Sequence, residues 1–288
     1  MKTKVVLFGS NGKIGKSIKR LFKKEFELFS VDLTKDRKKS EKNFFNLDLS
    51  KKVNLKKLGN INADVAIILS FYKSMPRDFL NEKKSNFFLI NNNILNNCIR
   101  ICKKLKVKKI IYFSSAAVYK NNKSKKKIKE SFRIEANNVY SKFKILAEKK
   151  IENYSNKYNL KFIILRLFNI FDNKGNDLIN NFKAQMRSKK NININGDGYQ
   201  SRDFLHISDI FSVLKKLINN EYGNQILNLC SGRPLSIRSI INKINKKKVK
   251  FTFNKKLKTN YFLVGDNGKI KKLTNWKIKK NFKLSLEK

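Results

Sequence analysis

Two side chains with spacing suited to proton transfer stand near the middle of the chain. Tyr140-Ser141-Lys142-Phe143-Lys144 places a lysine four residues after a tyrosine. On a helix, residues four apart share a face, so the ammonium of Lys144 would lie near the phenol of Tyr140. A free phenol has a pKa of about 10, too high for a base at neutral pH, and a neighbouring cation lowers it. The pair is therefore a candidate general acid/base.

The same spacing occurs once more nearby, and position decides between the two pairs. Tyr119 and Lys123 directly follow an apolar run and adjoin the basic stretch 123–129, which reads as an exposed loop. Tyr140 instead begins a stretch with apolar residues along one side. Before Tyr119, the segment Ser114-Ser115-Ala116-Ala117 leaves the apolar run. Ser115 could place a hydroxyl beside a substrate oxygen, and a simple turn explains the serines equally well.

A glycine-rich segment follows the first apolar run and opens a helical stretch. Gly9-Ser10-Asn11-Gly12-Lys13-Ile14-Gly15 holds three of the chain's 11 glycines in seven residues. Glycine permits the tight turn, lets the backbone approach a pyrophosphate, and lets the helix pack closely on the strand. The helix N-terminus then offers N–H groups to the phosphates. We expect cofactor contacts from Gly9, Asn11, Gly12, Lys13, Ile14 and Gly15.

Carboxylates beyond this segment suit the rest of a dinucleotide. Asp32 ends the second apolar run, where it would bind both ribose hydroxyls of NAD and repel the 2′-phosphate of NADP. Lys35 and Arg37 follow closely and would weaken that preference. Asp48-Leu49 stands where the adenine would lie, and capping of the next helix explains Asp48 equally well. Leu69, which ends the third run, Tyr140 and Lys144 complete the expected cofactor contacts.

Short apolar runs alternate with longer stretches over the first 165 residues. The runs, which resemble strands buried on both faces, are Val5–Phe8, Leu28–Val31, Val65–Leu69, Ile110–Phe113 and Phe162–Leu165. The expected helices are Lys13–Lys24, Lys51–Leu58, Arg77–Leu105 and Val139–Tyr158. This alternation predicts an α/β fold of the Rossmann type, with a doubly wound parallel sheet that binds ligands at the carboxyl ends of its strands.

The rhythm changes after residue 165. Expected strands are Ile192–Ile194, Phe204–His206, Gln225–Leu229 and Val249–Phe253, and expected helices are Asp177–Arg187, Ser208–Asn219 and Ser236–Ile244. We predict a dinucleotide-binding domain over 1–165 and a smaller, mainly substrate-binding lobe over 166–288, with parts of 204–230 returning to the first domain. Leu273, Trp276 and Phe282 indicate that the end of the chain packs.

Composition leaves two interpretations of the charge open. Lys and Arg number 67 against 21 Asp and Glu, a formal net charge of +46. Such a chain must be tested against nucleic acid as partner, but the lysines are spread along its length, and we favour compositional drift. No apolar run is long enough for a membrane helix. Cys98, Cys102 and Cys230 are expected to be buried thiols in a reducing cytoplasm, with no metal site.

In these motifs and their order, the sequence resembles the extended short-chain dehydrogenase/reductases that act on nucleotide sugars. Gly9, Gly12, Gly15 and Asp32 match the family's cofactor residues, Ser115 its catalytic serine, and Tyr140 and Lys144 its catalytic pair. Leu165–Asn169 resembles the segment whose Asn169 contacts the nucleotide sugar, and Gly196–His206 the segment whose Arg202 binds the diphosphate. Asn228–Gly232 and Leu273–Trp276 also match. The resemblance implies NAD as cofactor and a homodimer formed through helices near 77–105 and 139–158.

The resemblance implies a nucleotide-sugar epimerase acting at C4 through a transient 4-keto sugar. Lys120 and Asp172 stand where the family usually has glycine, and Ser70-Phe71 replaces a small-residue pair beside the cofactor. Ala116-Ala117 replaces the Asp-Glu pair of members that eliminate water, so a 4,6-dehydratase is not expected. A 4-keto-sugar reductase that uses NAD(P)H is an alternative, because it needs the same residues. An RNA-binding protein on the same fold is the alternative of another class.

Overall fold

The computed structural model describes residues 1–34, 43–72, 82–172, 178–188, 192–244, 250–254 and 262–279. The chain divides into two compact units, each assembled from separate segments. Unit 1 comprises Met1–Ser114, Asn138–Leu165 and Leu217–Ile226, and unit 2 comprises Ser115–Asn137, Arg166–Lys216 and Leu227–Lys288. The predicted boundary after residue 165 stays a prediction.

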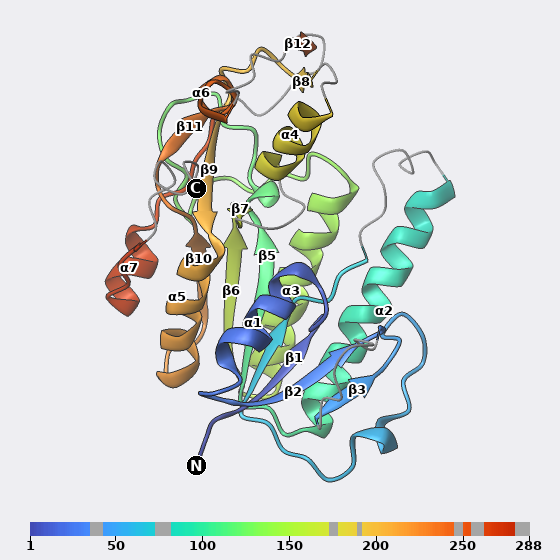
Figure 1. Ribbon diagram of the computed structural model, residues 1–288. Coiled ribbons are helices and arrows are strands. Elements are labelled where there is room, and N and C mark those ends of the chain that lie inside the picture. Colours follow the sequence, from blue (N-terminus) through green and yellow to red (C-terminus); the bar gives the residue numbers. More distant parts are fainter. Residues whose placement is uncertain are drawn as a thin grey trace. The chain divides into compact units, whose positions relative to one another are not determined.

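A seven-stranded sheet organises unit 1, with the order β10-β6-β5-β4-β1-β2-β3 (Figure 1). Its strands are β1 (Lys4–Phe8), β2 (Glu27–Asp32), β3 (Phe44–Asn46), β4 (Val65–Ile68), β5 (Lys109–Ser115), β6 (Lys161–Leu167) and β10 (Gln225–Leu229). All neighbours from β5 to β3 pair in parallel, which confirms the predicted sheet. The chain winds outward from β1 in one direction through β2 and β3, and in the other through β4 and β5. The order therefore reverses between β1 and β4.

The helices of unit 1 are α1 (Lys13–Phe22), α2 (Glu82–Lys104) and α3 (Val139–Lys157). Gly15, Ile18 and Phe22 form the buried stripe of α1, at the spacing of one helix face. Asn138 begins α3 with a capping box, because its side chain accepts from Ser141 N while the Ser141 hydroxyl bonds back to Asn138 N. The two long helices α2 and α3 pack against each other.

The expected helix at Lys51–Leu58 is wrong. Only the 3-10 turn η1 (Leu55–Leu58) forms there. Asn54 has extended backbone, its side chain accepts from Lys56 N at 3.0 Å, and Gly59 ends the turn at a φ of 60°. Local side-chain bonds of this kind compete with helix formation, so the stretch forms a capped turn instead.

Unit 2 holds a four-stranded sheet around β9. Its strands are β7 (Asn169–Phe171), β9 (Ser201–His206), β11 (Pro234–Ser236) and β13 (Phe262–Leu263), while β8 (Ile192–Asn195) and β12 (Phe251–Asn254) form a separate parallel pair. The remaining elements are η3 (Ala116–Val118), α4 (Leu178–Arg187), α5 (Ile207–Asn219, which continues into unit 1), α6 (Ile237–Ile244) and α7 (Gly268–Thr274). The expected strands and helices at these places are confirmed within the described residues, whereas Asp177 and Val249, at which two of them were expected to begin, lie outside those residues. β3, β7, β11 and β13 were not expected, because a strand of two or three residues leaves no periodic pattern, and the seven-residue helix α7 was not expected either.

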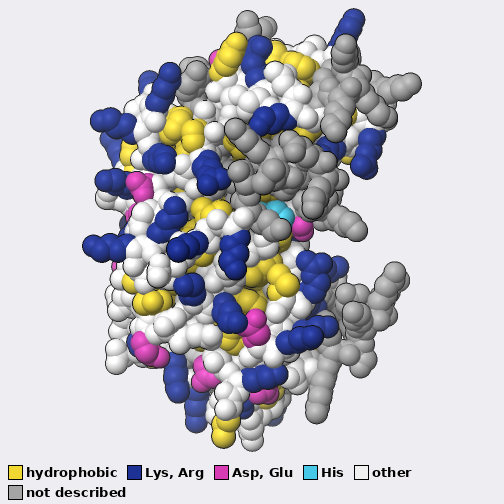
Figure 2. All heavy atoms as spheres, turned by 60° about the vertical axis from the view of Figure 1, so that its left-hand side comes forward, with side chains coloured by type: hydrophobic (Ala, Val, Ile, Leu, Met, Phe, Trp, Pro, Cys, Tyr) yellow, Lys and Arg dark blue, Asp and Glu magenta, His cyan; other side chains and the backbone are white. Residues whose placement is uncertain are grey.

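Three smaller predictions concern the surface and the tail. Trp276 is buried and donates to the Ser212 hydroxyl at 2.8 Å, so the chain packs at least to that point, whereas Phe282 lies outside the described residues. The stretch 123–129 is a loop, as expected, but it is not exposed throughout, because Ile128 is buried and pairs with Gly265. Lys and Arg side chains are scattered over the face in Figure 2 rather than gathered into one patch.

Within the described ranges, no helix is long and apolar enough to cross a membrane.

Candidate active site

The glycine turn after β1 is shaped by close backbone contacts. Gly9 has a φ of 78°, and a Cβ there would lie 2.9 Å from the backbone N of Ser70. A Cβ at Gly15 would overlap the carbonyl oxygen of Gly9. Glycine is thus required at Gly9 for the turn and for the approach to the end of β4, and at Gly15 for the approach of α1 to the turn.

The N-terminus of α1 opens from the same turn. Gly12 is its N-cap and supplies no side-chain hydrogen bond to the first helical turn, which includes Lys13 and Ile14. The first N–H groups of a helix need acceptors from outside it, and together with the helix dipole they favour an anion. This geometry fits a phosphate group.

Asp32 joins the end of β2 to the glycine turn. Its Oδ2 accepts from Asn11 N at 2.8 Å, and its Oδ1 accepts from Thr34 N at 3.2 Å. The side chain of Asn11 is fixed in turn, because its Oδ1 accepts from Lys19 Nζ at 2.6 Å. The Asp32 carboxylate, which suits a ribose, therefore lies beside the glycine turn, which suits a phosphate. A dinucleotide requires these two groups next to each other, because its ribose and diphosphate are adjacent.

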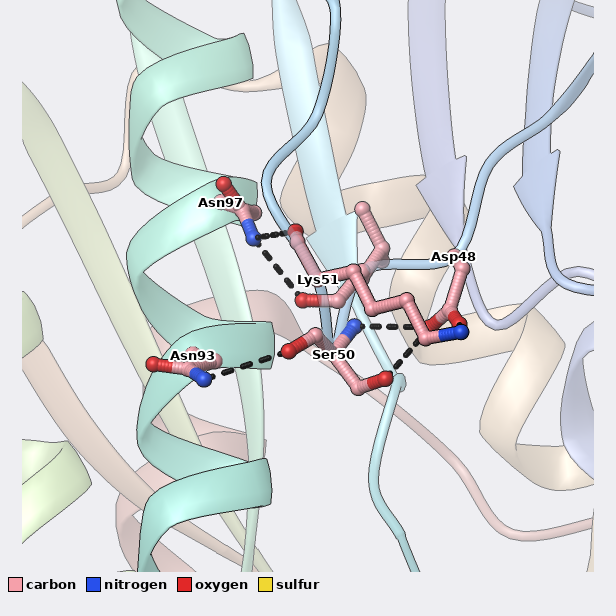
Figure 3. A network of polar contacts seen from close by, with 6 residues as sticks. Asp48, Ser50, Lys51, Asn93 and Asn97 are labelled. Carbon is pink, nitrogen blue, oxygen red and sulfur yellow. Dashed lines mark hydrogen bonds and ion pairs between the residues drawn. The ribbon is translucent and has the colours of Figure 1, made fainter.

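The side chain of Asp48 has local partners (Figure 3). Its Oδ1 accepts from Ser50 N at 2.9 Å, and its Oδ2 lies 3.8 Å from Lys51 Nζ. Asn97 on α2 holds the same turn by donating to Leu49 O at 2.9 Å and Lys51 O at 2.7 Å. These contacts make Asp48 part of a local turn over residues 48–51, and it caps no helix, because the helix expected to begin at Lys51 does not form. Leu49 is buried, and cofactor contacts of this pair stay a prediction.

Lys144 is buried among aromatic rings beside Tyr140. Its Nζ donates to the carbonyl oxygen of Phe113 at 2.8 Å and to the phenol oxygen of Tyr112 at 3.1 Å. The same Nζ lies 4.8 Å from the ring centroid of Phe71 and 5.9 Å from that of Tyr140. The rings of Phe71 and Tyr140 meet edge to face with centroids 5.2 Å apart. The predicted pairing of Tyr140 with Lys144 on one helix face is present.

Burial sets the electrostatics of this cluster. Burial lowers the pKa of Lys144 to about 7, and the nearby carboxylate of Glu148 opposes that shift. Glu148 is itself buried and accepts the hydroxyl of Ser114. Burial also raises the pKa of Tyr112 well above its ordinary value, so this phenol stays neutral. Lys144 can therefore change its charge close to neutral pH.

Sequence reasoning missed three residues of this cluster. Phe71 was noted only as a departure from a small-residue pair, and Tyr112 was assigned only to a strand. Glu148 stands four residues after Lys144 on α3, a spacing that places it on the same face and could have revealed it. The contact of Tyr112 could not be read from spacing, because it depends on β5 lying beside α3.

The parallel strand order places these groups in a row. Gly9 N donates to Val31 O at 2.9 Å, and Leu69 N donates to Phe8 O at 3.1 Å, so the carboxyl ends of β2, β1 and β4 are joined. β5 follows β4 in the sheet and ends in the segment that contacts Lys144. The row runs from the carboxylate of Asp32 through the glycine turn and Leu69 to Lys144. It fits an extended dinucleotide laid across the point where the strand order reverses.

Ser115 ends β5 and is the N-cap of η3. Its Oγ accepts from Ala117 N at 3.2 Å, which is the turn interpretation of the serine pair. Ser114 is the last residue of this segment in unit 1, and Ser115 begins unit 2. The predicted contact of the Ser115 hydroxyl with substrate stays a prediction.

Unit 2 brings the two expected substrate residues to neighbouring strands. Asn169 on β7 donates from Nδ2 to Asp203 O at 3.2 Å, and Arg202 on β9 donates to Ser201 O at 2.9 Å. Burial lowers the pKa of Arg202 to about 10, so the guanidinium keeps its charge at neutral pH. His206 caps α5, since its Nδ1 accepts from Ser208 N at 3.2 Å, and we assign it no catalytic role.

The carboxylate of Asp203, next to Arg202 on β9, holds two loops, one at residues 231–232 and one at Gly265. Its Oδ1 accepts from Ser231 N at 2.7 Å, and its Oδ2 accepts from Gly232 N at 2.8 Å and Gly265 N at 3.4 Å. Burial raises the pKa of Asp203 to about 6 even though these donors act in the opposite direction. The three cysteines are free and buried, as expected.

The NAD dependent epimerase/dehydratase family model matches residues 5–230. The chain is 30% identical over 176 residues to a Dictyostelium discoideum dTDP-D-glucose 4,6-dehydratase (56% of this chain, 40% of that one). It is 28% identical over 254 residues to a UDP-glucuronate 4-epimerase of Thermodesulfobacterium geofontis (83% and 76%). The chain spans between 40% and 62% of the length of three curated relatives that it matches.

A solved structure supports the fold. The UDP-glucuronic acid 4-epimerase of Bacillus cereus, in complex with UDP-glucuronic acid and NAD, superposes with a TM-score of 0.85 at 20% identity. The match covers 99% of this chain and 97% of that one. The Rossmann-type architecture expected from the sequence is thereby confirmed.

Proposed function

This chain belongs to the NAD dependent epimerase/dehydratase family, and from that premise we propose that it is an NAD-dependent nucleotide-sugar epimerase acting at C4. One observation carries the proposal. Lys144 is buried one helical turn after Tyr140, at the end of a row of strand termini that fits a dinucleotide. A protein that only binds a nucleotide and catalyses no reaction would not require a buried lysine beside a phenol at that place.

Gly9, Asn11, Gly12, Lys13, Ile14 and Gly15 would hold the pyrophosphate, and Asp32 the adenosine ribose. The carboxylate favours NAD over NADP, since a 2′-phosphate beside it would be repelled. Leu69, Tyr140 and Lys144 would contact the other half of the cofactor. When bound, NAD supplies the hydride acceptor and donor.

Proton transfer is the part assigned to the protein. Tyr140 would take the proton from the C4 hydroxyl and return it after the 4-keto sugar has turned over, with Ser115 bonded to the same oxygen. Lys144 has three N–H donors, and Tyr112 and Phe113 accept two of them. The third donor remains for the reacting pair or the cofactor.

Substrate binding is assigned to unit 2. The planar guanidinium of Arg202 suits the diphosphate, and Asn169 would contact the nucleotide sugar. Ala116 and Ala117 follow Ser115 in η3 and supply no carboxyl group. Elimination of water needs an acid and a base at that place, so we assign no 4,6-dehydratase activity.

We also propose a homodimer formed through α2 and α3, in the cytoplasm, and we favour compositional drift over a nucleic-acid partner as the source of the net charge of +46. A groove of about 360 Å³ between these helices is lined by Phe88, Leu89, Asn92, Leu95, Phe143, Leu146, Ala147 and Lys150. Leu89 is 59% exposed and Leu146 50% exposed, so apolar surface remains uncovered in the single chain. A second copy packed on α2 and α3 would bury this apolar surface. Light scattering of the wild-type protein and of the Leu89→Glu variant tests the proposed dimer.

The deciding experiment is incubation of the purified protein with UDP-glucose, UDP-N-acetylglucosamine or UDP-glucuronic acid, with products separated by chromatography. We expect the C4 epimer of at least one of them without added reductant, and NAD released on denaturation. Turnover of a 4-keto sugar only with added NAD(P)H would replace the epimerase by the reductase. RNA retained after a high-salt wash, with no dinucleotide bound, would contradict the enzyme proposal.

A further inference from the structure

The ammonium of Lys144 has a second phenol as its neighbour besides Tyr140. Tyr112 lies on β5 and is 3% exposed, and its oxygen is 3.1 Å from Lys144 Nζ. The Nζ also lies 4.8 Å from the centroid of the Tyr112 ring. Lys144 is therefore held by a residue of β5, which lies outside the segment of α3 that contains Tyr140 and Lys144.

The other fixed acceptor of Lys144 is the carbonyl oxygen of Phe113, the next residue of the same strand. Two acceptors from one rigid strand define the direction of the ammonium. Phe71, which follows β4 in the chain, covers the ammonium of Lys144, with its ring centroid 4.8 Å from Nζ. Lys144 is only 5% exposed, so water does not replace an acceptor that is lost.

We propose that Tyr112 is a positioning residue, whose neutral phenol holds the Lys144 ammonium against Tyr140 and keeps it charged in a buried site. The catalytic role of Tyr112 in this proposal rests on the proposed function. The contact between Tyr112 and Lys144 is observed independently of that function. Tyr112 accepts a hydrogen bond from Lys144 through its phenol oxygen, and Tyr140 acts on Tyr112 electrostatically.

The charged and titratable groups around this contact come from three elements. Tyr140 and Glu148 lie on α3, Tyr112 lies on β5, and Cys98 on α2 acts electrostatically on Tyr112. Burial and these neighbours raise the pKa of Tyr112, so its phenol remains a neutral acceptor throughout the range in which Lys144 titrates. A hydrogen bond to a charged group stabilises the charged form, so its loss favours the neutral amine.

The test is a titration of Lys144 by carbon-13 NMR, on protein labelled at the lysine ε-carbon and without cofactor or substrate. Lys144→Met removes one resonance and so assigns it. We expect Tyr112→Phe to lower the midpoint of that resonance by about one pH unit. An unchanged midpoint would overturn the proposal.

Tyr119→Phe is the matched control, because it also deletes a buried phenol hydroxyl. That hydroxyl donates to Asn228 at 2.6 Å, so the Lys144 midpoint should stay at the wild-type value. An equal shift in both variants would mean general loosening and would contradict a specific role. Should Tyr112→Phe fail to fold, 3-fluorotyrosine introduced at position 112 alone keeps the test open, since fluorination weakens the phenol as acceptor and should lower the same midpoint.

The catalytic consequence is measured separately. With an active substrate, Tyr112→Phe should lower kcat about tenfold near pH 7 and leave KM within twofold, and the loss should change with pH. A shifted Lys144 midpoint with no turnover of any nucleotide sugar would retain the contact and reject the proposed function. A shifted midpoint with kcat unchanged at every pH would overturn the positioning role alone.

Discussion

The carboxylate of Asp32 accepts the backbone N–H of Asn11 at 2.8 Å, across 21 residues of sequence. One side chain therefore holds Asn11, the third residue of the glycine turn, and also faces the place proposed for the ribose. The geometry of the glycine turn and the proposed preference for NAD over NADP therefore both depend on the Asp32 carboxylate. A change at Asp32 should alter both.

We expect Asp32→Asn to weaken NADH binding by about 10- to 100-fold, since a charged acceptor is lost. NADPH binding should weaken less or improve, because the repulsion of the 2′-phosphate is removed. Fluorescence titration of both cofactors measures this change in preference. Equal losses for the two cofactors would indicate that Asp32 acts only on the turn.

Asp48→Asn provides the matched comparison. Asparagine keeps an oxygen that can accept from Ser50 and loses only the charge that faces Lys51, so the free energy of unfolding should fall by less than about 1 kcal/mol. NADH affinity should remain within about threefold of wild type. A loss as large as that of Asp32→Asn would instead assign Asp48 to the adenine.

Tyr140→Phe should lower kcat by about 10²- to 10⁴-fold, because the general acid/base is removed. Cofactor affinity should change far less, since the ring still packs against Phe71. Tyr154→Phe removes a phenol hydroxyl from the same helix and serves as the control in the product assay. Near-wild-type turnover by Tyr140→Phe would contradict the assignment.

Gly15→Ala should abolish most cofactor binding, because the added Cβ would push α1 away from the turn at Gly9. Gly59→Ala makes the same change where a Cβ meets nothing within 4 Å and only the backbone conformation is strained. That variant should lose about 1–3 kcal/mol of stability and keep its cofactor affinity. Thermal unfolding and NADH titration of both variants separate the two effects.

The pH dependence of stability should contain a contribution from Asp203. Its pKa is raised to about 6 in the folded protein, above that of an unfolded aspartate, so the folded state binds this proton more tightly. The contribution is fully present below about pH 4 and is lost as the pH rises through 6, for a total of at most about 3 kcal/mol.

Urea unfolding at several pH values measures this contribution as the difference between wild type and Asp203→Asn. Asparagine does not titrate, so the stability of wild type relative to the variant should fall from pH 5 to pH 7. A relative stability that is flat over this interval and instead rises with pH below about pH 4 would show that the donors of Ser231, Gly232 and Gly265 outweigh burial.

Much of the fold could be predicted because its signals are local. Val5–Phe8 and Phe162–Leu165 are apolar runs with no polar alternation, and both lie in strands buried within the sheet. The stretch 51–58 was mistaken for a helix because its spacing allows one, while Asn54 and Gly59 favour a capped turn. The two-residue strand β13 is too short to leave a periodic pattern.

The candidate site divides in the same way. Tyr140 and Lys144 are four residues apart on one helix, so their proximity follows from helical geometry alone. Phe71 and Tyr112 reach the same ammonium from β4's loop and from β5, at sequence distances of 73 and 32 residues. Such contacts depend on the order of strands in the sheet, which no local spacing encodes.

The position of β10 has a consequence for synthesis of the protein. This strand is at the edge of the sheet next to β6, yet it is made only after residue 224, well after β6 ends at residue 167. A nascent chain that has emerged as far as β6 therefore exposes an unpaired strand edge while the intervening segment is translated. Release of the polypeptide before residue 229, by a premature stop codon or a stalled ribosome, should yield an aggregation-prone fragment rather than an independent nucleotide-binding domain.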